Sequence, residues 1–135
     1  MVLDASVALA WFIDNPVPGY AVRVRQALID GAGAVVPALW HLEIANGLAV
    51  AERRRTLSVT DLTACLVQLE KLSARIETEV TILSARQALD IARSFQLSAY
   101  DGTYFETART EGLPLATLDN ALRAAAVKSG IEMFR

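Results

Sequence analysis

Four acidic residues have the side-chain type and the placement to bind divalent cations together: Asp4, Glu43, Asp101 and Asp119. Mg²⁺ and Mn²⁺ prefer oxygen ligands, and ions held by carboxylates can activate a water for attack on phosphorus and stabilise the leaving oxygen. Zinc is a poorer candidate, because the chain has one His and one Cys without the spacing of a zinc site. We therefore predict that the four carboxylates hold one or two Mg²⁺ or Mn²⁺ ions and catalyse phosphodiester hydrolysis.

Glu43 and Asp101 are predicted to lie on helices, on faces where an unpaired charge is unfavourable. Glu43 is the only acid between Pro37 and Glu52, in a nearly uncharged helix, and Asp101 begins a stripe with Tyr104 on the core side of its helix. A carboxylate that loses its water is tolerated when it is paired or bound to a metal. Both residues are therefore expected to need a cation.

Asp4 and Asp119 are of interest because each follows a predicted strand. Asp4 comes directly after Val2–Leu3, and Asp119 follows Leu115–Thr117 by two residues. In an open parallel sheet, ligands bind beyond the carboxyl ends of the strands, so all four acids are expected at one rim. Three neutral oxygen donors are placed to support the carboxylates from behind: Ser6, Asn46 and Thr117.

Three of these acids also have a purely structural alternative, as caps of helices. Ser98-x-x-Asp101 resembles a capping box with Asp in place of Glu, and Asp4 and Asp119 could each cap the helix that follows. Glu43 has no capping role. The catalytic interpretation depends on the four residues meeting at one rim, and for Asp4, Asp101 and Asp119 taken singly both interpretations stay open.

Short apolar strands alternate with helices along the chain, which predicts an α/β fold: a central parallel sheet of about five short strands with helices on both faces, in three α/β/α layers. The predicted strands are Val2–Leu3, Ala34–Val36, Ile76–Val80, Leu115–Thr117 and Ile131–Phe134. The predicted helices are an apolar helix capped by Ser6 and ending near Phe12, then Tyr20–Ile29, Leu39–Arg53, Thr60–Ala74, Ser84–Phe95, Ala99–Glu111 and Asn120–Lys128.

Composition limits the class of protein. With 135 residues, 53% of them hydrophobic and 21% charged, residues 1–135 are expected to form one globular domain, without a membrane segment and in the cytoplasm. The single cysteine, Cys65, has the helical spacing of a core residue. A net charge of -2 argues against binding of nucleic acid through the overall charge of the protein. Any polyanionic substrate must therefore bind at a local basic region. Arg53–Arg55 could bind phosphates, although a solvated helix end is the commoner explanation for such a run. His41 lies on a different helical face from Glu43.

Four motifs in order resemble the PIN-domain family, specifically VapC-type toxins: Val2–Ser6, Leu42–Asn46, Ser98–Asp101 and Leu115–Asp119. The resemblance runs the whole chain, and one departure is the short segment before Asp4. It implies a Mg²⁺- or Mn²⁺-dependent endoribonuclease that cuts RNA such as tRNA or rRNA. It also implies inhibition by a cognate antitoxin and a homodimer that forms a heterotetramer or larger assembly with it. Two alternatives remain: a phosphatase or DNase with the same acids, and a non-catalytic binding module for an Arg-bearing partner.

Overall fold

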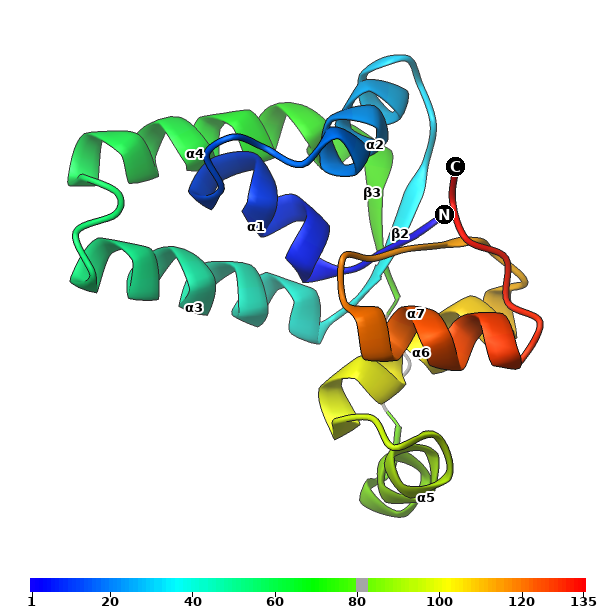
Figure 1. Cartoon of the computed structure of the whole chain (residues 1–135). Coiled ribbons are helices and arrows are strands. Elements are labelled where there is room, and N and C mark those ends of the chain that lie inside the picture. Colours follow the sequence, from blue (N-terminus) through cyan, green and yellow to red (C-terminus); the bar gives the residue numbers. More distant parts are fainter. Residues whose placement is uncertain (80–82) are drawn as a thin grey trace.

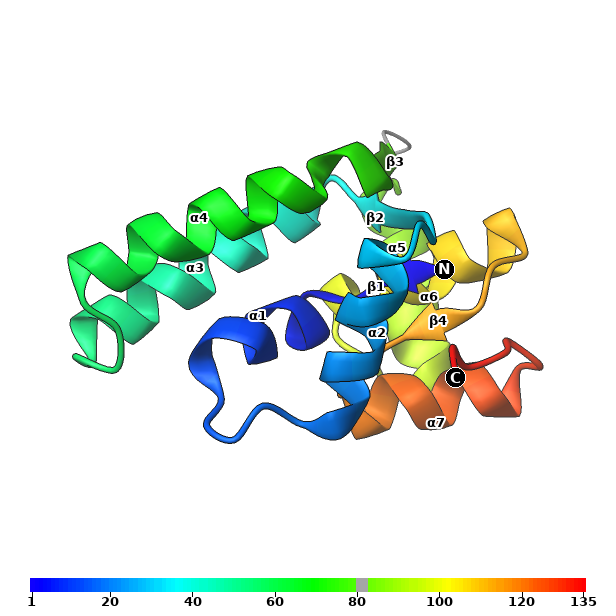
Figure 2. The same ribbon diagram turned by 90° about the horizontal axis from the view of Figure 1, so that it is seen from above.

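The computed structural model describes residues 1–79 and 83–135 and has a parallel sheet between layers of helices (Figure 1 and Figure 2). Its strands are β1 (Val2–Leu3), β2 (Ala34–Pro37), β3 (Ile76–Glu79) and β4 (Leu115–Ala116), in the order β3-β2-β1-β4. Val2 pairs in register with Val35 and with Leu115. The predicted three-layer α/β/α architecture is confirmed, while Val80 of the strand expected at Ile76–Val80 lies outside the described residues.

Within the described residues, the sheet has four strands where about five were predicted. The strand expected at Ile131–Phe134 is reduced to one bridge, in which Met133 pairs in parallel with Leu115. The amide of Leu115 donates to the carbonyl of Glu132 at 2.8 Å, and the carbonyl of Leu115 accepts from the Phe134 amide at 2.9 Å. Because β4 has only two residues, it offers the C-terminal segment little edge along which to extend.

The predicted helices are confirmed to within two residues at each end. α3 and α4 lie side by side as a long hairpin that projects beyond the sheet, and α6 packs against β1, β2 and β4 (Figure 1). Among the described residues, no helix combines the length and the apolar character needed to cross a membrane. The helices are α1 (Ala5–Ile13), α2 (Gly19–Ile29), α3 (Leu39–Arg53), α4 (Val59–Leu72), the 3₁₀ turn η1 (Ser73–Arg75), α5 (Ala85–Phe95), α6 (Ala99–Glu111) and α7 (Asn120–Lys128).

The prediction that Ser6 caps the first helix is wrong. α1 begins at Ala5, so Asp4 takes the N-cap position, but its side chain makes no capping hydrogen bond. The Ser6 hydroxyl instead donates to the carboxylate of Asp4 at 2.5 Å. Cys65 is buried, as predicted, with 5% of its surface exposed. The core thus behaves as the apolar pattern indicates, and the departure is at Asp4.

Candidate active site

Asp4 lies in the turn between β1 and α1, with 5% of its surface exposed. Both hydroxyl groups that reach it donate to the same oxygen, Oδ2: Ser6 Oγ at 2.5 Å and Thr117 Oγ1 at 2.6 Å. Burial raises the pKa of the Asp4 carboxyl, and the two hydroxyl hydrogen bonds oppose this rise. The structure therefore places the hydroxyl groups of Ser6 and Thr117 in direct contact with the carboxylate of Asp4.

The same two hydroxyl groups also bind the turn between β4 and α7. Thr117 is fully buried, and its Oγ1 accepts the backbone N–H of Asp119 at 2.9 Å, while Ser6 Oγ accepts the N–H of Leu118 at 3.1 Å. Each hydroxyl thus donates to Asp4 and accepts from the neighbouring turn. This arrangement fixes the two turns that follow β1 and β4 relative to each other.

Glu43 lies on α3, half-buried, and accepts a short hydrogen bond from the hydroxyl of Tyr104. One turn further along α3, a Cβ on Gly47 would lie 2.6 Å from Leu9 Cδ2, so glycine permits the close approach of α3 to α1. Burial raises the pKa of Glu43, and the negative charges of Asp4 and Asp101 raise it further, while the Tyr104 bond lowers it.

Tyr104 is the site residue that the sequence interpretation missed. It lies on α6 with 0% exposure, and burial together with the Glu43 carboxylate raises its pKa far above the usual value for tyrosine. The pattern placed Tyr104 on the core side of its helix without assigning a partner to its hydroxyl group. A buried tyrosine hydroxyl usually finds a hydrogen-bond partner, so Tyr104 three residues after Asp101 was the available signal.

Asp101 and Asp119 both take part in helix capping. Ser98 Oγ accepts the N–H of Asp101 at 3.0 Å and donates to its Oδ2 at 2.6 Å, while Asp119 Oδ1 accepts the N–H of Leu122 at 2.7 Å. Both acids therefore have the helix-capping contacts that the structural alternative predicted for them. Asp101 also acts on the other acids, because its negative charge raises the pKa values of Asp4 and Glu43.

The structure thus brings three carboxylates, Asp4, Glu43 and Asp101, within electrostatic range of one another, with Asp119 joined to Asp4 through Thr117. Within residues 1–79 and 83–135, none of the three pairs with a Lys, Arg or His side chain. In the same residues, no three His, Cys, Asp or Glu side chains are close enough to hold one ion as they stand. The donor atoms suit Mg²⁺ or Mn²⁺, although the ligand set is not fully assembled.

Asn46, predicted to support the carboxylates, and His41, predicted to lie on a different helical face, take no part in these contacts. Asn46, one turn after Glu43, is exposed, and its side chain has no hydrogen bond within the part of the chain that the structure describes. His41 is exposed, and its Nε2 lies 2.9 Å from Thr78 Oγ1 on β3, in keeping with its expected separate helical face. Neither residue contacts Asp4.

Arg123, on α7, is a cation next to the site that the sequence did not point to. Its Nη2 donates to the carbonyl of Thr117 at 2.8 Å, and its guanidinium lies 5.5 Å from the centre of the Tyr20 ring. The Tyr20 hydroxyl donates to the carbonyl of Phe134 at 3.1 Å. Arg123 therefore binds the backbone carbonyl of Thr117, the residue whose side chain binds Asp4.

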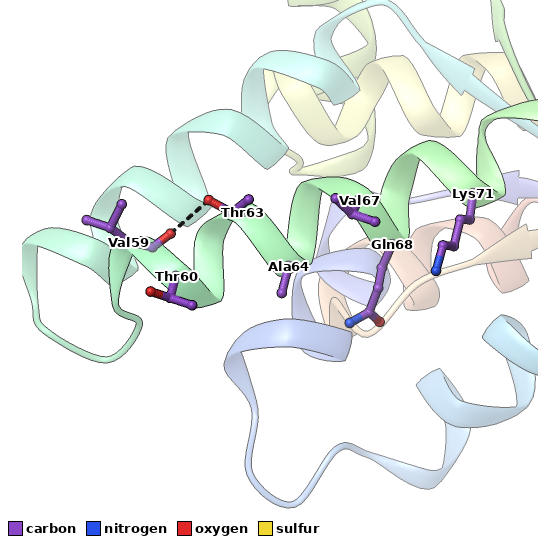
Figure 3. A pocket seen from close by; sticks show the side chains of 7 residues that line it. All are labelled: Val59, Thr60, Thr63, Ala64, Val67, Gln68 and Lys71. Carbon is purple, nitrogen blue, oxygen red and sulfur yellow. Dashed lines mark hydrogen bonds between the residues drawn. The ribbon is translucent and has the colours of Figure 1, made fainter.

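A separate hollow of about 550 Å³ lies along α4, away from these carboxylates (Figure 3). It contains no acid and no nucleophilic pair, so it is not the candidate catalytic site. All seven residues that line it come from α4: Val59, Thr60, Thr63, Ala64, Val67, Gln68 and Lys71.

A three-layer α/β/α domain with a buried carboxylate at the carboxyl end of a central parallel strand, and further acids on the elements around it, defines a class of candidate phosphodiester hydrolases. The model of the PIN domain family matches residues 1–128, so the chain belongs to the PIN domain family. PIN domains are generally nucleases that use divalent metal ions. The resemblance read from the four motifs is confirmed at this level.

Two solved structures share the fold. The crystal structure of PAE2754 from Pyrobaculum aerophilum is similar at 21% identity and a TM-score of 0.66, covering 92% of this chain and 82% of that one. The crystal structure of FitAcB from Neisseria gonorrhoeae is similar at 21% identity and a TM-score of 0.66, covering 99% of this chain and 96% of that one. No curated protein matches the sequence.

Proposed function

We propose that this PIN domain protein is a Mg²⁺- or Mn²⁺-dependent endoribonuclease and the toxin of a VapBC-type toxin–antitoxin pair. The observation that carries the nuclease proposal is the environment of the Asp4 carboxylate, which follows a central strand and has 5% of its surface exposed. Its side chain makes no capping hydrogen bond and no ion pair with a described cation, and the negative charge of Asp101 raises its pKa. A buried carboxylate in this state is unfavourable unless a cation joins it. Family membership supplies the class of reaction.

The four acids are proposed as metal ligands, with Asp4 at the centre. The hydroxyls of Ser6 and Thr117 engage Oδ2 of Asp4 and orient the carboxylate, while the Tyr104 hydroxyl does the same for Glu43. Asp101 presents Oδ1, because Ser98 occupies Oδ2. A bound divalent ion would activate water for in-line attack on phosphorus and stabilise the leaving oxygen. Asn46 stays exposed, where it can contact substrate.

The antitoxin and a second copy of the chain are proposed as protein partners, in the cytoplasm. Large apolar side chains are exposed on several helices, among them Leu42 at 73%, Tyr100 at 66% and Leu66 at 52%. Exposed apolar side chains of this size are typical of surfaces that other proteins cover. Leu42 adjoins Glu43 in the sequence, so a protein covering this face would lie beside the proposed catalytic residues.

The test compares cleavage of tRNA and rRNA by the wild-type protein and by Asp4→Asn and Asp101→Asn, with Mg²⁺, Mn²⁺ or EDTA. We expect metal-dependent cleavage by the wild type and a loss of about 10³-fold or more in each variant, with unchanged circular dichroism. Glu52→Gln is the matched control, because it removes an exposed charge on the opposite face of α3.

Three outcomes would contradict the proposal. Unchanged cleavage by both variants would exclude these acids as ligands. Cleavage of DNA or small phosphate esters in preference to RNA would favour the phosphatase or DNase alternative. Absence of Mg²⁺ and Mn²⁺ binding by calorimetry, together with binding of an Arg-rich peptide, would favour the non-catalytic binding module.

A further inference from the structure

Three consecutive arginines, named here the arginine tip, lie at the outer end of α3: Arg53 ends the helix, Arg54 is its C-cap and Arg55 lies in the turn that follows. They are the only adjacent basic residues in the sequence. All three are exposed, and none of their side chains has a hydrogen bond or an ion pair within residues 1–79 and 83–135. The α3–α4 hairpin carries them away from the sheet, so the tip stands clear of the rest of the domain (Figure 1 and Figure 2).

The backbone of the tip is strained at Arg55, which has a φ of 59°. The chain uses glycine at three other positions with positive φ: Gly31, Gly112 and Gly130. A residue with a side chain is less stable in the left-handed region than in right-handed backbone, and glycine avoids most of this cost. Gln96 shows that the fold tolerates such strain elsewhere. At Arg55 the strained position carries a third positive charge instead of the glycine that would relax the turn.

The nearest acids leave the tip without compensation. Asp61, on the α4 side of the hairpin, accepts both the backbone N–H and the hydroxyl of Ser58, at 2.8 Å and 2.6 Å, and does not pair with an arginine. Glu52 directly precedes the tip on α3 and is exposed, but within residues 1–79 and 83–135 it makes no ion pair with Arg53, Arg54 or Arg55. The positive charge of the tip is therefore free to attract an anionic ligand.

One face of α3 connects the tip to the proposed catalytic residues. Asn46, Val50 and Arg53 follow Glu43 by three, seven and ten residues, the spacing of a single helical face. This face carries no acid between Glu43 and Arg53, and Asn46 is exposed on it. At 1.5 Å per residue, Arg53 lies about 15 Å along the helix axis from Glu43. That length corresponds to roughly four nucleotides of stacked strand at 3.4 Å each.

We propose that the arginine tip binds the phosphate backbone of the RNA substrate about four nucleotides from the cleaved bond, with Asn46 along the path. This inference rests on the proposed ribonuclease function. Guanidinium groups suit phosphate because they are planar, always charged and bind two oxygens at once. The chain carries a net charge of -2, so a local group of cations is where a polyanion can be held.

The experiment measures RNA binding by proteins that carry Asp4→Asn, so that the RNA stays intact. The test variant adds Arg53→Gln, Arg54→Gln and Arg55→Gln. The matched control adds Arg86→Gln, Arg93→Gln and Lys128→Gln, which removes the same charge from α5 and α7. Single-stranded RNAs of about 4 and about 12 nucleotides and an acidic peptide are titrated at several salt concentrations. Thermal melting checks the folding of each protein.

We expect the test variant to bind the longer RNA about 10- to 100-fold more weakly than Asp4→Asn alone. The slope of log affinity against log salt should fall by about 2, since each lost phosphate contact on a single strand removes about 0.7. The control should change neither quantity by more than about 3-fold.

The inference is overturned if test and control variants bind the longer RNA equally, if the short RNA is weakened as much as the longer one, or if the variant loses only binding of an acidic peptide. If the tip variant has melted, Arg55→Gly alone, which relaxes the backbone, serves as the second variant and should weaken the longer RNA several-fold. Failure of the ribonuclease proposal looks different, because wild-type protein with metal would then cleave no RNA of either length.

Discussion

Asp4 and Asp119 begin from the same local geometry and are used in different ways. Each follows a short strand and occupies the N-cap position of the next helix, with φ and ψ of -74° and 144° at Asp4 and of -72° and 123° at Asp119. Asp119 caps its helix by accepting the N–H of Leu122. Asp4 makes no capping bond and accepts two side-chain hydroxyls instead. Equal backbone geometry therefore does not decide what an acid after a strand does.

The position of each strand in the sheet explains the difference. β1 lies between the strands β2 and β4, whereas β4 has β1 on one side and only the single bridge to Met133 on the other. Burial removes water from Asp4, and the hydroxyls of Ser6 and Thr117 replace it. Asp119 keeps more contact with solvent and serves its own helix. This difference supports the proposal in which Asp4 is the central metal ligand and Asp119 a supporting one.

Thr117→Val should have the largest effect on stability among these variants, because the Thr117 hydroxyl bonds to the side chain of Asp4 and to the backbone N–H of Asp119. The substitution keeps the shape of the side chain but removes the donor to Asp4 and the acceptor of the Asp119 N–H. We expect a loss of about 1–3 kcal/mol in unfolding free energy, measured by urea denaturation. Cleavage should fall about 10- to 100-fold. Thr117→Ser is the control, because it keeps the hydroxyl group, and it should retain most of the stability and most of the cleavage. Stability and cleavage of Thr117→Val equal to wild type would refute the role of the Thr117 hydroxyl at both acids.

Asp4→Asn should change how the stability of the metal-free protein depends on pH. The folded pKa of Asp4 is raised by burial, so its stabilising contribution is complete below the unfolded pKa of about 3.9 and is lost as pH rises through the folded value. Each unit of difference corresponds to about 1.4 kcal/mol. The wild-type protein should therefore lose stability as the pH rises, and the Asp4→Asn variant should lose less. Glu43 contributes with the same sign in both proteins.

Urea denaturation across pH 4 to 8, with and without Mg²⁺, measures this effect. Saturating Mg²⁺ should restore stability to the wild type at neutral pH and have little effect on Asp4→Asn. Asp119→Asn is the control and should follow the wild-type curve without metal. Parallel curves for wild type and Asp4→Asn would mean that the carboxylate of Asp4 is not held in the unfavourable state described here.

Tyr104→Phe extends the comparison to a carboxylate on a helix. Loss of the hydroxyl removes the bond that lowers the pKa of Glu43, so this pKa should rise and the acidic limb of the pH–rate profile should move to higher pH. We expect about a 10-fold loss of cleavage near neutral pH and a stability change within about 1.5 kcal/mol. A fall in rate without a shift of the profile would show that Tyr104 acts only through packing.

The sequence predicted the fold well because its signals are local. Apolar periodicity placed the helices to within two residues, and the alternation of strands and helices predicted a parallel sheet. The fifth strand failed because its length depends on the partner edge: β4 has two residues, which no pattern at Ile131–Phe134 reveals. The error at Ser6 has the same origin. A serine near a helix start predicts a cap, and only the folded structure shows that the hydroxyl group faces Asp4.

The sequence identified acidic residues of the candidate site, but not the hydrogen bonds that join them to other elements. Position after strands and isolation on an apolar helix identified Asp4 and Glu43 as unusual, and both are buried or half-buried with raised pKa values. The contacts of Tyr104 and Arg123 join elements far apart in the sequence, so spacing along one helix could not reveal them. Whether the four acids bind metal together remains a prediction, which the variants above test.

Substitutions at Asp119 should have the smallest effect on stability and separate its two roles. Asp119→Ala removes the side-chain cap and should cost about 1 kcal/mol, whereas Asp119→Asn keeps an acceptor and should change stability by only a few tenths. If Asp119 also binds metal, the Asn variant should retain wild-type melting while its cleavage falls about 10-fold. Equal cleavage by Asp119→Asn and wild type would leave Asp119 as a helix cap alone, and the metal site would then rest on Asp4, Glu43 and Asp101.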